Sequence, residues 1–211
     1  MLVGGRPPAT EADLHRPSVG PSVTGDTDAG HVDSSGADAG DLDAVVYDLD
    51  GTLVRLAVDW AALEADMEAV LRDAGVEPDG FGAWELLDAA ERAGVGSEVE
   101  ALVAAAERDG ARDSIRLALA DELPEGGLPV GVCSLNCEAA CRIALETHGL
   151  AGAVEYVVGR DSIPERKPAP EPLLAVVEAL GASPERTLFV GDSASDRTTA
   201  KRAGTRFAPV T

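Results

Sequence analysis

Short runs of apolar, mostly β-branched residues recur along the chain from residue 44 onward. Runs of this kind are typical of strands that are buried on both faces of a parallel sheet. Four of them are clear and the last is weaker, and they cover residues 44–47, 128–133, 154–158, 187–190 and 205–209. We therefore expect about five strands, with folded structure starting at Asp43.

Between the later runs, apolar residues recur at helical spacing over 138–148, 170–180 and 195–203. Gly181 and Gly204 follow the second and third of these segments, where a glycine commonly ends a helix. Strands that alternate with helices indicate a parallel sheet in an α/β fold.

One long stretch breaks this alternation. From about Val58 to Asp121 the periodicity is helical and no strand pattern appears. We expect three or four helices inserted after the first strand. Trp60 and Trp84 are predicted to lie in the core of this insertion, with substrate contact as the less favoured alternative.

Residues 1–42 have a different composition, dominated by Gly, Pro, Ser, Thr, Ala and Asp without any apolar period. Such a segment cannot bury enough apolar surface to fold alone. We expect a disordered acidic tail, or alternatively the product of a mis-assigned translation start.

The charge balance excludes some classes of function. The 211 residues include 38 Asp and Glu against 17 Lys and Arg, for a formal net charge of −21. A field of this sign repels nucleic acids and anionic membrane surfaces, so neither is expected as a partner. Only Lys167 and Lys201 are lysines. We interpret the acidic, arginine-rich composition as halophilic, which predicts a melting temperature that rises steeply with KCl.

The chain has no apolar run of the roughly 18 residues that a membrane span requires, and no apolar segment typical of a signal peptide near its start. Its cysteines, Cys133, Cys137 and Cys141, are an odd number within nine residues. This is a poor disulfide framework and fits a reducing compartment. We therefore predict a cytoplasmic protein.

The first strand runs into Asp48-Leu49-Asp50-Gly51-Thr52. Alternation along an extended chain places Asp48 and Asp50 on one side, where two like charges favour a bound cation. A second Asp-x-Asp pair, Asp41 and Asp43, lacks both the preceding apolar strand and the following turn, and we assign it to the solvated tail.

Polar residues also follow the other apolar runs. In parallel sheets the carboxyl ends of the strands meet at one edge, where ligands bind, so these residues should converge. Carboxylates, a hydroxyl and a lysine together suit Mg²⁺ beside a phosphate group. The residues that follow the later runs are Ser134, Asn136, Lys167, Asp192 and Asp196.

These motifs, in this order, resemble the haloacid dehalogenase (HAD) superfamily in its phosphoglycolate phosphatase-like phosphatase branch. The resemblance covers residues 44 to about 208. It implies a Rossmann-like parallel sheet with a small α-helical cap inserted after the first strand. The implied core domain is 43–56 with 123–211, and the implied cap is 57–122.

The resemblance also implies a role for each residue. Asp48 would be the nucleophile that forms an aspartyl-phosphate, and Asp50 the general acid and base. Asp48, the backbone carbonyl of Asp50, and Asp192 would hold Mg²⁺, with Asp196 in support of the metal or of Lys167. The substrate, a small phosphorylated metabolite, would be bound through its phosphate by Thr52, Ser134, Asn136 and Lys167.

Some of these residues have plainer interpretations. Ser134 could simply be part of a turn, and Asn136 could be a helix N-cap. The cysteines have no fourth Cys or nearby His to complete a metal site, so we predict that they are buried packing residues. His148 is predicted to be a helix-terminal residue.

Three other functions remain open from the sequence. A phosphomutase would use the same Asp48 and Asp50, and a non-catalytic acidic interaction module would keep only the fold. A haloalkanoate dehalogenase needs no second carboxylate, so Asp50 argues against it. No motif in the cap specifies the substrate, and nothing in the sequence specifies the oligomeric state.

Overall fold

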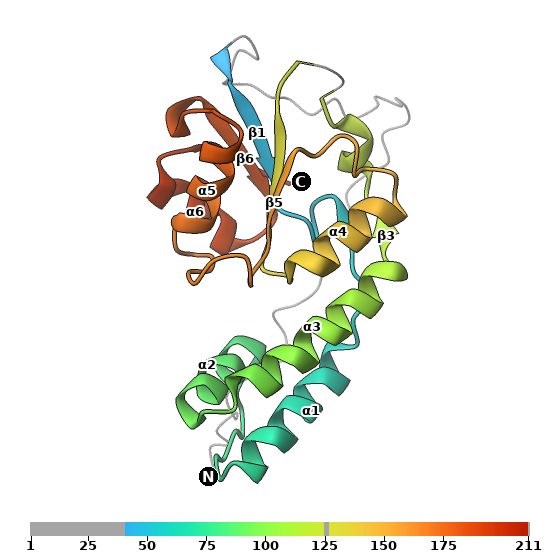
Figure 1. The fold of residues 1–211 in the computed structure, drawn as a ribbon, viewed down its shortest axis with the longest axis vertical. Coiled ribbons are helices and arrows are strands. Elements are labelled where there is room, and N and C mark those ends of the chain that lie inside the picture. The colour runs from blue at the N-terminus through green and yellow to red at the C-terminus, as the bar shows by residue number, and fades with distance from the viewer. Residues whose placement is uncertain (1–40, 125–126, 211) are drawn as a thin grey trace, which may run out of the picture. The chain divides into compact units, whose positions relative to one another are not determined.

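The computed structural model describes residues 41–124 and 127–210. Its main sheet has five parallel strands in the order β5-β4-β1-β6-β7 (Figure 1). The fold class predicted from the alternation of strands and helices is confirmed, and all five strands lie within or beside the predicted runs. They are β1 (Ala44–Tyr47), β4 (Val130–Cys133), β5 (Tyr156–Val158), β6 (Thr187–Gly191) and β7 (Arg206–Pro209).

Helices cover both faces of this sheet, and its three central strands β4, β1 and β6 are buried almost throughout. Alternate residues of β1 enter different cores: Val45 and Tyr47 pack with α4 (Glu138–Thr147), whereas Val46 packs with α5 (Glu171–Ala179) and α6 (Ala194–Ala203). In Figure 1, α5 and α6 lie on one side of the strands and α4 on the other. This two-sided burial explains why the strands have continuous apolar runs.

A helical insertion separates β1 from β4. It consists of α1 (Trp60–Asp73), α2 (Ala83–Ala93) and α3 (Gly96–Arg112). These helices share an apolar core of their own, built around Leu63, Met67, Leu86, Val99 and Val103. A 3₁₀ helix (Ala118–Glu122) follows. Among the described residues, no helix combines the length and the apolar character that crossing a bilayer requires.

The expectation of no strand in this stretch was wrong. Two very short strands, β2 (Val54–Arg55) and β3 (Ile115–Arg116), pair antiparallel where the helical insertion begins and ends. Two residues are too few to produce a period-2 pattern, so this pairing could not be detected from apolar periodicity.

The tryptophans were also predicted wrongly. Trp60 is 38% exposed and Trp84 is 42% exposed, so neither belongs to the core of the helical insertion. Each lies in the first turn of its helix, and neither belongs to the apolar core that the three helices share. Trp84 is instead covered by the guanidinium of Arg166, 6.0 Å from the ring centroid.

The cysteine prediction is confirmed: Cys133, Cys137 and Cys141 are free thiols, and all are buried. Burial raises the pKa of Cys133 to about 12 and that of Cys137 to about 11, so these thiols are protonated near neutral pH. His148 is the C-cap of α4, in agreement with its predicted terminal position.

Most of the predicted tail, residues 1–40, lies outside the described residues. Asp41 and Asp43 are described, and both are ion-paired to Arg186, at 2.9 and 2.8 Å. The second Asp-x-Asp pair is therefore attached to the turn that precedes β6.

Candidate active site

The predicted site residues follow the carboxyl ends of neighbouring strands. Asp48 comes directly after β1, Ser134 after β4 and Asp192 after β6, and these three strands are adjacent in the sheet. Lys167 lies in the loop between β5 and α5. The sheet order therefore brings these residues to one edge, as expected for a parallel fold.

Lys167 links two buried aspartates. Its Nζ donates to Asp48 Oδ1 at 2.9 Å and to Asp196 Oδ1 at 2.6 Å. All three side chains are at most 9% exposed. Asp196 also accepts from the backbone N–H of Ser193 at the start of α6, which holds its carboxylate at the end of β6.

Asp192 completes this group of carboxylates. One oxygen each from Asp48, Asp192 and Asp196 lie within 4.8 Å of one another, close enough for a single metal ion. We call Asp48, Lys167, Asp192 and Asp196 the aspartate cluster. Gly51 lies against it with φ +83°, and a Cβ at that position would be 2.2 Å from Asp192 Oδ2. The turn after β1 thus requires glycine both for its conformation and for the approach of Asp192.

Electrostatics favour a cation at this cluster. Burial raises the pKa of Asp48 to about 6, although the positive charge of Lys167 works in the opposite direction. For Lys167, burial disfavours the charged form, but the charge of Asp48 and of the other neighbouring acids outweighs it and raises its pKa. One lysine faces three carboxylates, so a divalent cation with oxygen ligands fits the donor set.

Asp50 and Thr52 lie in the turn that follows Asp48. Asp50 Oδ1 accepts from the backbone N–H of Leu56 at 2.9 Å, and its pKa is raised chiefly by burial. Thr52 is fully buried, and its Oγ1 has no hydrogen-bond partner among the described residues. A buried hydroxyl without a partner is costly unless a ligand satisfies it.

Ser134 and Asn136 form a small network after β4. Ser134 Oγ donates to Asn136 Oδ1 at 3.0 Å and accepts from the backbone N–H of Asn136 at 3.2 Å. The N-cap interpretation of Asn136 was wrong. Cys137 is the N-cap of α4, and the amide of Asn136 instead donates to Glu107 Oε1 at 3.3 Å.

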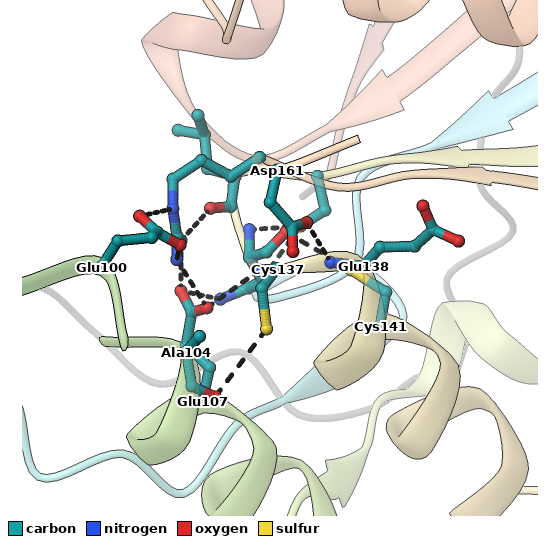
Figure 2. Close-up of polar contacts among 11 residues, drawn as sticks. Glu100, Ala104, Glu107, Cys137, Glu138, Cys141 and Asp161 are labelled. Carbon is teal, nitrogen blue, oxygen red and sulfur yellow. Dashed lines mark hydrogen bonds and ion pairs between the residues drawn. The ribbon is translucent and has the colours of Figure 1, made fainter. Parts of the chain in front are cut away.

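The sequence interpretation missed a second group of charges, the buried Glu107 and Arg160 with the half-buried Glu100, which we call the junction cluster. Arg160 follows β5 after Gly159, whereas both glutamates lie on α3 of the helical insertion. Figure 2 shows Glu100 and Glu107 reaching from α3 toward the segment that contains Cys137. A signal was available: Glu107 follows Val99 and Val103 at four-residue spacing, so it occupies the apolar stripe of α3.

Arg160 is fully bonded within this cluster. Its Nε and Nη2 donate to Glu100 at 3.1 and 2.7 Å, its Nη1 and Nη2 donate to Glu107 at 2.6 and 3.0 Å, and Nη1 also donates to the carbonyl of Leu135 at 2.6 Å. These five bonds use all the N–H groups of a guanidinium. Burial opposes its charge, but the hydrogen bonds to Glu107 and Glu100 raise the pKa of Arg160 further.

A parallel sheet whose central strand ends in a buried aspartate, beside a lysine and two more carboxylates, defines a HAD-type hydrolase fold. Residues 42–204 match the family model described as haloacid dehalogenase-like hydrolase, so the chain belongs to this family. The resemblance inferred from the motifs is therefore confirmed.

The similar proteins indicate which branch of the family the chain resembles. The chain is 36% identical over 183 residues to a phosphoglycolate phosphatase of Rhodospirillum rubrum, with 76% of each chain covered. It is 30% identical over 189 residues to a phosphoglycolate phosphatase of Aquifex aeolicus, which covers 78% of this chain and 82% of that relative. Among solved structures, a HAD-superfamily hydrolase of subfamily IA, variant 1, from Geobacter sulfurreducens aligns with a TM-score of 0.56 at 26% identity. That alignment covers 80% of this chain and 89% of the other.

Proposed function

We propose that the protein is a Mg²⁺-dependent phosphatase that hydrolyses a small phosphate monoester through an aspartyl-phosphate intermediate. The observation that carries this proposal is the position of Asp48, a buried carboxylate 2.9 Å from Lys167 and within 4.8 Å of two further aspartates. The similarity to phosphoglycolate phosphatases supports the same reaction class.

Asp48 acts as the nucleophile. One of its carboxylate oxygens forms a bond to phosphorus while the bond from phosphorus to the ester oxygen breaks, which leaves an aspartyl-phosphate and an alcohol. Lys167 holds the carboxylate in place, because Asp196 fixes the other side of its ammonium group. Water then attacks the phosphorus, releasing inorganic phosphate and restoring Asp48.

Asp50 acts as the general acid and base. It donates a proton to the departing ester oxygen and then takes one from the attacking water, so it is restored at the end of the cycle. Burial raises the pKa of Asp50, which favours the protonated carboxyl group that donates to the departing ester oxygen. Leu56 N–H orients one of its oxygens and leaves the other for the proton.

The chain's own residues also hold the phosphate and the metal. The phosphoryl oxygens are bound by Thr52, Ser134, Asn136 and Lys167. The Thr52 hydroxyl, which finds no hydrogen-bond partner in the part of the chain that the structure describes, supports its assignment. Asp48, the backbone carbonyl of Asp50, and Asp192 hold Mg²⁺, with Asp196 supporting the site through Lys167. When bound, Mg²⁺ neutralises charge on the transferring phosphoryl group.

The helical insertion serves as the cap over this site, and it selects the substrate. A contact between α2 and the loop that carries Lys167 supports this role, because Arg166 in that loop pairs with Asp88 and covers Trp84. The names of the similar enzymes make phosphoglycolate the first substrate to test.

The test is hydrolysis of p-nitrophenyl phosphate and of phosphoglycolate in high KCl, with Mg²⁺ and with EDTA. Wild-type protein is compared with Asp48→Asn and with the matched control Asp41→Asn, which changes the exposed Asp-x-Asp pair instead. We expect turnover that requires both Mg²⁺ and Asp48, with a loss of at least about a thousandfold in Asp48→Asn. Full turnover in EDTA or in Asp48→Asn contradicts the mechanism, and a folded but inactive wild type contradicts the function.

A further inference from the structure

Glu107 is an ionisable residue in an apolar position. It lies one helical turn beyond Val103 and two beyond Val99 on α3, and it is only 1% exposed. A carboxylate that is removed from water in this way is tolerated only when its oxygens are fully hydrogen-bonded. Its partners therefore indicate what it does.

All of those partners are donors, and they come from two segments of the core, residues 136–137 and Arg160. Oε1 accepts from Asn136 Nδ2 at 3.3 Å and from Arg160 Nη1 at 2.6 Å. Oε2 accepts from the backbone N–H of Cys137 at 2.9 Å and from Arg160 Nη2 at 3.0 Å. A glutamine would turn an NH₂ group toward one pair of these donors, so the site selects a carboxylate.

One of these bonds reaches the predicted phosphate-binding residues. Because the Nδ2 end of Asn136 is held by Glu107, its Oδ1 end faces Ser134, whose Oγ lies 3.0 Å away. The orientation of a buried amide is decided by such a network. A carboxylate on the helical insertion thus determines how Asn136 meets the Ser134 hydroxyl.

Arg160 holds α3, the helix that carries Glu107, in place for this contact. It follows β5 and binds both Glu100 and Glu107, so it attaches α3 to the sheet at two points. The chain can pass close to α4 there only because residue 159 is glycine, where a Cβ would be 2.3 Å from the backbone nitrogen of Glu138. The carboxylate of Asp161 then accepts from that same N–H at 2.7 Å.

We propose that Glu107 is a positioning residue for the phosphatase reaction, which sets Asn136 and Ser134 for phosphate while Arg160 holds α3 against the core. The inference rests on the proposed function and deepens it. It makes phosphate affinity depend on a residue of the helical insertion, outside the core motifs of the family.

The first experiment compares Glu107→Gln with Glu100→Gln in the full chain. Both variants remove one carboxylate charge from the same arginine, but only Glu107 contacts Asn136 and Cys137. The readouts are kcat and KM for p-nitrophenyl phosphate with Mg²⁺, and the inhibition constant of inorganic phosphate. We expect Glu107→Gln to raise the inhibition constant and KM about tenfold, and Glu100→Gln to change them by less than about twofold.

A double-mutant cycle then separates positioning from general destabilisation. In an Asn136→Ala background, Glu107→Gln should add less than about twofold to the loss, because both changes break the same path to Ser134. Additive losses overturn the inference. So do equal effects of Glu100→Gln and Glu107→Gln on the inhibition constant, because they would show that the contact of Glu107 with Asn136 contributes nothing to phosphate binding.

If Glu107→Gln alone does not fold, the variant Glu107→Leu with Arg160→Met replaces it. Removing both partners of a buried ion pair is tolerated better than removing one. We expect the folded double variant still to bind phosphate about tenfold more weakly, since Asn136 has lost its acceptor. Unchanged affinity in this variant overturns the inference. A wild type without any phosphatase activity overturns the proposed function and this inference with it, whereas an active wild type beside an unaffected Glu107 variant overturns the inference alone.

Discussion

The junction cluster and the aspartate cluster each contain a buried cation that donates to two carboxylates, but the rest of their hydrogen bonding differs. In the junction cluster, Arg160 makes five bonds and Glu107 accepts four, so every polar group of that pair has a partner. In the aspartate cluster, Lys167 faces three carboxylates, and Asp192 is exposed.

From this difference we infer that the junction cluster is structural and that the aspartate cluster is the one suited to bind a ligand. A complete network fixes one arrangement of the chain and has no capacity left for another molecule. An incomplete network keeps excess negative charge, and here it lies beside a buried threonine hydroxyl without a partner in the described residues. The same comparison predicts that removing a charge lowers the unfolding free energy at the junction cluster and raises it at the metal-free aspartate cluster.

The largest expected effect on stability is at the junction cluster. Arg160→Met leaves Glu107 buried beside no cation, and breaking a buried pair in this way costs about 3–5 kcal/mol of unfolding free energy. Urea denaturation of wild type and variant measures it. The comparison fails if the variant unfolds within about 1 kcal/mol of the wild type.

At the aspartate cluster the loss of a charge should stabilise the metal-free protein. The folded pKa of Asp48 is about 6, above the ordinary value of 3.8, so its stabilising contribution is complete below 3.8 and is lost as the pH rises through 6. Asp48→Asn cannot ionise, so the variant keeps the stability that the wild type loses above pH 6. A difference of two pKa units corresponds to at most about 3 kcal/mol of unfolding free energy.

The measurement is urea denaturation in EDTA across this pH range. The stability difference between Asp48→Asn and wild type should be near zero at about pH 3.5 and largest above about pH 7. Asp41→Asn, at an exposed position, serves as the control and should show no such rise. A variant that is less stable than wild type above pH 7 would show that Asp48 is better satisfied than we infer.

With Mg²⁺ bound, the ionised Asp48 should stabilise the folded state instead of destabilising it. At about a hundred times its Kd, Mg²⁺ stabilises the folded state by about 2.7 kcal/mol, and thermal unfolding with Mg²⁺ or EDTA detects this shift. The effect should shrink at about pH 5, because Asp48 must lose its proton to bind the ion. An equal shift in Asp48→Asn would place the ion elsewhere.

The smallest effect is expected at the exposed contact between α2 and the loop that carries Lys167. The side chains of Arg166 and Asp88 are 33% and 56% exposed, so Asp88→Asn should cost less than about 1 kcal/mol. Denaturation in low and high KCl checks this, because salt screens an exposed pair more than a buried one. A loss as large as that of Arg160→Met would mean that the two contacts are equivalent.

Much of the fold could be predicted from the sequence because its strands are buried on both faces and its helices are amphipathic. Residues such as Asp48 and Lys167 could be found because each follows an apolar run or lies in a motif. The prediction that these residues lie close together needed only the rule that the carboxyl ends of parallel strands meet at one edge of the sheet. The halophilic and cytoplasmic interpretations remain predictions from composition.

What the sequence analysis missed depends on contacts between distant residues. Arg160 and Glu107 are 53 positions apart, and in a chain with 38 Asp and Glu residues the presence of one glutamate is not informative. The exposure of Trp60 and Trp84 was missed because the prediction rested on residue type, which does not determine whether a side chain near a helix end is covered. Only the interruption of the apolar stripe of α3 by Glu107 was a local signal.

The pairing of β2 with β3 has a consequence for how this architecture can evolve. The helical insertion leaves and re-enters the core at two neighbouring segments, where Val54 pairs with Arg116 and Arg55 with Ile115. Because the two ends are held together, lengthening the segment between them costs conformational entropy that grows only logarithmically with length. The insertion can therefore be enlarged, trimmed or exchanged while the register of the five-stranded sheet and the aspartate cluster at its edge are kept.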